Sequence, residues 1–80
     1  MAKKPNPPIN HDVPGLLRRL REDADLTQRD LAIRLRRNQP WIHKSEYGER
    51  RVDVSEFLDW CAACRCDPHA ALGLLIKHSK

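Results

Sequence analysis

Residues 27–48, TQRDLAIRLRRNQPWIHKSEYG, decide the fold of this 80-residue chain. At the start of the segment, Thr27 is a good N-cap, and Asp30 stands three positions later as a short capping-box acid. Leu31 and Leu35 follow four residues apart, on one face of a helix, with Ala32 beside them. The pattern therefore predicts a helix from about 27 to 35.

The second half of the segment predicts another short helix, from about 39 to 47. Asn38 can cap it, Pro40 falls in its first turn, where a missing N–H costs nothing, and Gly48 stops it. Ile42 is its main core residue, so the polar side is better explained by a ligand than by folding. A turn of about three residues between the two helices forces a steep crossing, the geometry of a helix-turn-helix.

Three further helices are expected around this pair: one from about 14 to 25, one that begins at the reciprocal cap of Asp53 and Glu56, and one that begins at Asp67-Pro68. Their apolar faces are Leu16, Leu17 and Leu20; Val54, Phe57, Leu58, Cys61 and Cys64; and Ala71, Leu72, Leu75 and Ile76. The predicted fold class is all-α, a compact bundle of about five short helices that contains a helix-turn-helix.

Length and composition agree with one small domain. Eighty residues are enough for one domain at most, and with four aromatic residues the apolar set is mostly leucine and alanine, which suits helices. Residues 1–13 hold three of the six prolines and no periodic apolar pattern, so they are expected to be a flexible arm. The predicted domain is 14–78.

The positive charge is concentrated in the centre of the chain. From residue 28 to 51 there are seven basic and three acidic side chains, a balance of +4, which equals the net charge of the whole chain. A patch of this kind favours a polyanion such as nucleic acid.

The remaining features point to a cytoplasmic protein. Residues 1–14 have no apolar segment like that of a signal peptide, and no apolar run approaches the roughly 20 residues that cross a membrane. Three cysteines, an odd number, fit a reducing compartment.

Cys61, Cys64, Cys66 and His69 raise the hypothesis of a zinc site, because they place four possible ligands close together. The same positions continue the apolar stripe from Phe57, and a free cysteine behaves as a small buried hydrophobe. Core packing is therefore the preferred interpretation, with no metal and no cofactor. A Cys66–His69 dyad would lack a binding cleft, and no phosphate loop is present, so the chain is not expected to be an enzyme.

A longer motif runs through the two central helices and the loop that follows them: Gln28-x-x-Leu31-Ala32, Gln39-Pro40-Trp41-Ile42-x-Lys44-x-Glu46-x-Gly48 and Arg50-Arg51. This motif resembles the Cro/lambda-repressor-like (xenobiotic-response-element type) helix-turn-helix family, over residues 16 to about 75. The resemblance implies a domain that binds double-stranded DNA with the helix at 39–47 in the major groove.

The resemblance also assigns residues. Gln39, His43 and Lys44 match positions that read bases, since glutamine pairs with adenine and lysine donates to guanine. Trp41 lies near the groove edge or, alternatively, packs against the preceding helix. Contacts to phosphates fall to Gln28, Arg29, Arg37, Asn38, Tyr47, Arg50 and Arg51. Arg21 and Glu46 match a structural ion pair between the first and third helices.

Three positions depart from the family pattern. Arg36 replaces the glycine that usually makes the turn, so a left-handed conformation there would cost about 1 kcal/mol. Arg37 and Ser45 stand where apolar residues are common, which weakens the packing of the second helix of the motif.

Together these features predict a transcriptional regulator, most simply a repressor that occludes polymerase. The family resemblance implies a bacterial or phage source and a palindromic operator. A homodimer through the last helix is expected, because Leu74, Leu75 and Ile76 exceed what a small core needs. The alternative is a protein-interaction module of the same fold, such as an antitoxin or regulatory subunit, with little DNA binding.

Overall fold

The computed structural model describes residues 11–77, which form five α-helices and contain no β-strand. The helices are α1 (Val13–Asp23), α2 (Gln28–Leu35), α3 (Gln39–Glu46), α4 (Val54–Ala63) and α5 (Pro68–Lys77). The predicted all-α class is confirmed. Most of the predicted arm, residues 1–10, and the predicted domain end at 78 lie outside the described residues.

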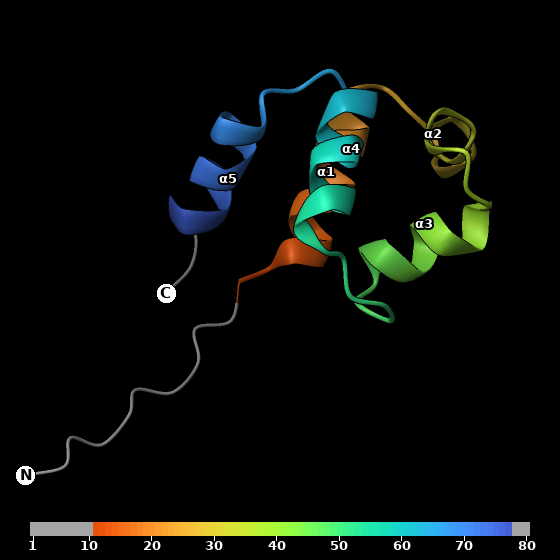
Figure 1. Ribbon diagram of the computed structural model, residues 1–80, viewed down its shortest axis with the longest axis horizontal. Helices are drawn as coiled ribbons and strands as arrows, with labels where there is room; N and C mark the ends of the chain where they lie inside the picture. The colour runs from red at the N-terminus through yellow and green to blue at the C-terminus, as the bar shows by residue number, and fades with distance from the viewer. Residues whose placement is uncertain (1–10, 78–80) are drawn as a thin grey trace, which may run out of the picture.

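Two central helices, α1 and α4, separate α2 and α3 on one flank from α5 on the other (Figure 1). α1 contacts both α3 and α5, while α4 contacts both α2 and α5. The helix-turn-helix pair therefore packs against the centre with its inner side and leaves the outer side to solvent. None of the described helices is long and apolar enough to cross a membrane.

Local hydrogen bonds set the helix starts, as the sequence predicts. The Thr27 hydroxyl accepts from the backbone N–H of Asp30 at 3.0 Å, and the Asp30 carboxylate accepts from the N–H of Thr27 at 3.0 Å. The bond from the Thr27 N–H to the carboxylate is the main cause that lowers the pKa of Asp30. Asp53 and Glu56 make the same reciprocal cap on α4, and Asn38 caps α3 through the N–H of Trp41 at 2.9 Å.

Three non-glycine residues in the left-handed region end the first, second and fourth helices: Asp25 at φ 58°, Arg36 at φ 56° and Arg65 at φ 55°. After Arg36, the N–H of Arg37 donates to the carbonyl of Ala32 at 2.9 Å, and after Arg65 the N–H of Cys66 donates to Cys61 at 2.9 Å. These are the long hydrogen bonds of Schellman motifs. Arg36 thus adopts the conformation expected at the place of the usual glycine.

Trp60 is the largest fully buried side chain and joins the two central helices. Its indole N–H donates to the carbonyl of Leu17 at 3.0 Å, so the ring is buried without an unsatisfied donor. The apolar pattern of the sequence does not include Trp60. The prediction that Val54 and Leu58 lie on the buried face of α4 is wrong, because they are 75% and 48% exposed. α4 is rotated so that Trp60, Cys61 and Cys64 face inward.

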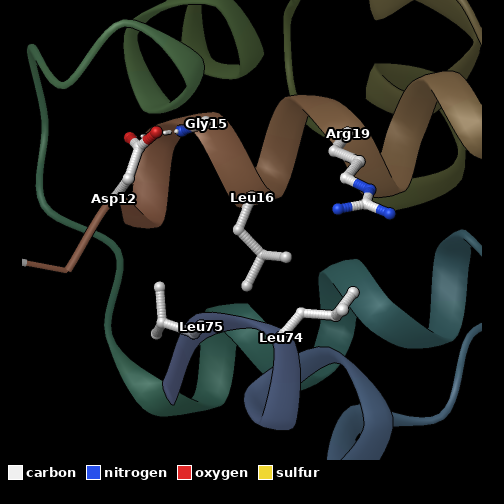
Figure 2. Close-up of a pocket in the computed structure, with 6 residues that line it drawn as sticks. All are labelled: Asp12, Gly15, Leu16, Arg19, Leu74 and Leu75. Carbon is white, nitrogen blue, oxygen red and sulfur yellow. Dashed lines mark hydrogen bonds between the residues drawn. The ribbon is translucent and has the colours of Figure 1, made fainter. Parts of the chain in front are cut away.

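α5 is the least buried helix, with Ala71 as its one buried residue. Leu74 and Leu75 project toward Leu16 of α1, where they line a groove of about 240 Å³ (Figure 2). The expected buried face was partly wrong, because Leu72 is 45% exposed and Ile76 is exposed as well. α4 and α5 therefore leave apolar side chains at the surface.

Arg65→Gly tests the cost of the left-handed conformation. Glycine adopts positive φ without a Cβ clash, so the free energy of unfolding should rise by up to about 1 kcal/mol. Ala62→Gly, an exposed position inside α4, is the matched control and should lower it by about 1 kcal/mol. Denaturant titration measures both changes. Equal losses in the two variants would contradict the interpretation.

Candidate nucleic-acid interface

α3 has a sharply divided surface. Ile42, Ser45 and Glu46 are buried on its inner side, whereas Gln39, His43 and Lys44 are exposed on its outer side. The exposed residues line a shallow depression together with Pro40 and Glu49. The turn at Arg36 leads into α3, which packs on both α1 and α2, and these predicted base-reading side chains stay exposed to solvent.

A buried ion pair holds the inner side of α3. The Arg21 guanidinium donates from Nε to Glu46 Oε2 at 2.6 Å and from Nη2 to Glu46 Oε1 at 3.0 Å. Its third nitrogen, Nη1, donates to the carbonyl of Leu26 at 2.8 Å. Hydrogen bonding to Glu46 is the main cause that raises the pKa of Arg21. The structure thus contains the α1–α3 pair that the family resemblance implies.

A chain of hydrogen bonds leads from this pair to the surface. Gln28 Nε2 donates to Glu46 Oε1 at 3.1 Å, and Gln28 Oε1 accepts from Gln39 Nε2 at 3.4 Å. A carboxylate only accepts, so Glu46 draws the amide nitrogen of Gln28 toward itself and leaves the oxygen for Gln39. The buried charge therefore orients the amide of Gln39, and Gln28 makes contacts inside the protein.

Trp41 lies half-buried between α3 and α4. Its ring is 6.2 Å from that of Trp60, measured between centroids. The guanidinium carbons of Arg50 and Arg37 lie 4.1 Å and 4.8 Å from its centroid. The sequence left open whether Trp41 lies at the groove edge or packs against the preceding helix, and the structure shows it packed on Trp60 of α4.

Arg50, expected at a phosphate, points into the protein. Nη1 donates to the hydroxyl of Ser45 at 3.1 Å, and Nη2 donates to the carboxylate of Glu56 at 2.7 Å. The Ser45 hydroxyl in turn donates to the carbonyl of Trp41 at 2.8 Å. A buried serine is thus satisfied where an aliphatic residue is common. Sequence reasoning assigned only the capping role to Glu56 and missed its ion pair.

The other residues predicted to contact phosphates lie at the surface. Exposed side chains on or beside the motif are Arg29, Arg37, Asn38, Tyr47 and Arg51. The Tyr47 ring lies 4.3 Å from that of His43, so one predicted phosphate contact packs on one predicted base reader. These five side chains are therefore accessible to a ligand.

The cysteines lie in the core and its edge. Cys61 and Cys64 are buried, Cys66 is half-buried, and all three are free thiols. Burial raises the pKa of Cys61 to about 12 and that of Cys64 to about 11. Within residues 11–77, no group of three or more His, Cys, Asp and Glu side chains is arranged to hold a metal ion.

Comparison with known proteins agrees with this architecture. The family model of the helix-turn-helix domain matches residues 15–72. The solved structure of an XRE-family-like protein from Pseudomonas syringae pv. tomato is 43% identical with a TM-score of 0.75, over 81% of this chain and 79% of that one. The restriction-modification controller protein C.AhdI from Aeromonas hydrophila is 25% identical, with a TM-score of 0.68 over 75% and 91%.

The clp gene regulator ClgR from C. glutamicum shares the fold, at 22% identity and a TM-score of 0.77 over 90% of this chain and 94% of that one. No curated protein matches the chain. The fold and the family match define a helix-turn-helix protein of the class that binds DNA and regulates transcription. The chain belongs to the helix-turn-helix domain family, in its Cro/lambda-repressor-like or XRE branch.

The raised thiol pKa values predict slow alkylation of two cysteines. At pH 8, Cys66 should react quickly with iodoacetamide, while Cys61 and Cys64 react slowly until the protein is denatured. The pKa values of Cys61 and Cys64 in the folded protein lie above the ordinary value of 9.0. The stability that these two neutral thiols contribute is therefore complete below about pH 9. It is lost as the pH rises toward 11 and 12.

Mass spectrometry of time points measures the three rates, and Cys66→Ser should remove the fast one. Three equal rates in the native protein would contradict the burial of Cys61 and Cys64.

Proposed function

We propose that the chain is a sequence-specific repressor that lays α3 in the major groove of double-stranded DNA. The supporting observation is the outer face of α3, which exposes Gln39, His43 and Lys44 while a buried ion pair holds the inner face. A repressor of this size acts most simply by occluding polymerase, in the cytoplasm of a bacterium and on its nucleoid. The role is regulatory rather than enzymatic.

Each base-reading role follows from donor and acceptor chemistry. Gln39, with one amide hydrogen directed to Gln28, keeps a second hydrogen and its oxygen for N7 and N6 of adenine. Lys44 is exposed and suits guanine O6 and N7. His43 lies one turn beyond Gln39 beside Tyr47, and the accessible edge of Trp41 borders the groove wall.

The exposed basic and polar side chains supply phosphate contacts around the reading helix: Arg29, Arg37, Asn38, Tyr47 and Arg51. Gln28 contributes through the N-terminus of α2, where the helix dipole favours an anion. The balance of +4 in residues 28–51 strengthens this attraction and makes it sensitive to salt.

A second copy of the chain is the proposed partner on a palindromic operator. α4 and α5 expose Val54, Leu58 and Leu72 around an apolar groove of about 320 Å³. Leu74 and Leu75, which the sequence assigned to the dimer, also pack against Leu16 within the monomer (Figure 2). We place the dimer contact on Leu58, Leu72 and Ile76, with Leu74 and Leu75 at its edge.

Analytical ultracentrifugation tests the dimer. The wild type should sediment as a dimer at high micromolar concentration, and Leu58→Asp should give a monomer, since a buried carboxylate without a partner is costly. Ile33→Asp is the matched control, because Ile33 is 71% exposed on α2 and should leave the dimer intact. A monomeric wild type with and without DNA would remove this interface.

DNA recognition is tested by selecting sites from a random duplex library and measuring affinity at two salt concentrations. One enriched motif is expected, bound more weakly as salt rises. Gln39→Ala and Lys44→Ala should each lose about 1–3 kcal/mol at particular base pairs. Arg65→Ala removes one positive charge outside α2 and α3 and should leave base preference unchanged.

If no motif is enriched and the binding is weak and sequence-blind, α3 does not read DNA. The protein-interaction function would then replace this proposal, and Lys44→Glu should leave complex formation with the partner intact.

A further inference from the structure

A cluster of five side chains joins α3 to the first turn of α4. It consists of Arg37, Trp41, Ser45, Arg50 and Glu56, and we call it the Arg50 cluster. Two of its members, Trp41 and Ser45, belong to the proposed reading helix. The cluster therefore couples the orientation of α3 to the position of α4.

The Arg50 guanidinium makes two hydrogen bonds and one ring contact, and all three are with groups of the protein. Nη1 and Nη2 donate to Ser45 and Glu56, and the guanidinium carbon lies 4.1 Å from the centroid of the Trp41 ring. The side chains of Arg50 and Glu56 are 25% and 18% exposed. An ion pair this shielded is screened less than a surface pair, so its geometry is held more firmly.

The core alone gives α3 few restraints. Ile42 is its one buried aliphatic residue, while Ser45 and Glu46 are polar. The Arg21–Glu46 pair ties α3 to α1, and the Arg50 cluster ties it to α4. Two polar restraints toward different neighbouring helices therefore limit the rotation of α3 about its own axis.

Glu56 is the negative member of the cluster, which also contains the guanidinium groups of Arg37 and Arg50. Its hydrogen bond with Arg50 lowers its pKa, and the charge of Arg37 acts in the same direction. Without that carboxylate, Arg37 and Arg50 would both lie near the Trp41 ring with no opposing charge in the cluster. Like charges at this range repel, so the side chains that restrain Trp41 and Ser45 would move.

We propose that Glu56 is a positioning residue for DNA recognition, which acts through Arg50 to hold α3 in its reading orientation, and that Arg50 itself makes no phosphate contact. This role rests on the function proposed above. It replaces the phosphate role that the sequence suggested for Arg50 and assigns a function in recognition to a residue outside the helix-turn-helix motif.

A double-mutant cycle with Glu56→Gln and Arg50→Gln tests the proposal. Glutamine keeps an oxygen that can accept from the N–H of Asp53, so the cap of α4 is preserved. Affinity is measured for the selected operator and for a random duplex, after circular dichroism has shown each variant to be folded at the assay temperature.

Each single variant should bind the operator about tenfold more weakly, and the double variant should be no weaker than Arg50→Gln. Binding to the random duplex and the salt slope should stay at wild-type values, because no phosphate contact is lost. Glu22→Gln is the matched control. It removes the same charge from an exposed ion pair with Arg18 and should change operator affinity less than twofold.

A phosphate contact by Arg50 would give a different set of results. If Arg50 contacts a phosphate, Glu56→Gln frees its guanidinium and strengthens binding to both duplexes, while Arg50→Gln lowers the salt slope by about 1. That result, or additive losses in the cycle, overturns the positioning role. A wild type without any operator preference removes the proposed function and this role together, whereas a selective wild type with an unaffected Glu56→Gln removes this role alone.

Discussion

The carboxylate of Glu46 has no exposure to water, and the arrangement of the interface depends on it. A buried charge of this kind is costly unless it is paired and its lone pairs are satisfied. Arg21 supplies two hydrogen bonds and Gln28 a third, from two different helices. The C-terminal end of α3 is therefore tied to α1 and α2 at once, and the amide of Gln28 is left with its oxygen toward Gln39.

The flank of α3 that faces α4 is organised by similar chemistry. Arg50 and Glu56 pair next to Trp41, and the hydroxyl of Ser45 lies between the guanidinium and the helix backbone. Polar contacts thus replace much of the aliphatic packing usually expected behind such a helix. They constrain direction more than apolar contacts do, since hydrogen bonds require both distance and angle. That property suits the role proposed for α3, in which its outer face meets base edges in register.

Much of the fold could be predicted from the sequence, because its signals are local. The caps at Thr27, Asn38 and Asp53 join groups three residues apart, so neighbouring sequence alone specifies them. The buried face of α4 was mispredicted, since two apolar stripes overlap on that helix. Trp60 resolves the choice through a hydrogen bond to Leu17, 43 positions away, which no local pattern contains.

The residues of the candidate interface also fall into two groups, those that the sequence places and those that only the tertiary structure places. Once Ile42 is placed inward, helical periodicity turns His43 and Lys44 away from the core, so the sequence by itself determined the helices and most of the proposed reading face. Gln39 lies three residues before Ile42 and is exposed in the first turn of α3. The direction of Arg50 was decided only by the tertiary structure. A guanidinium binds a phosphate or a carboxylate equally well, and here the packing of α4 against α3 brings Glu56 within 2.7 Å of it.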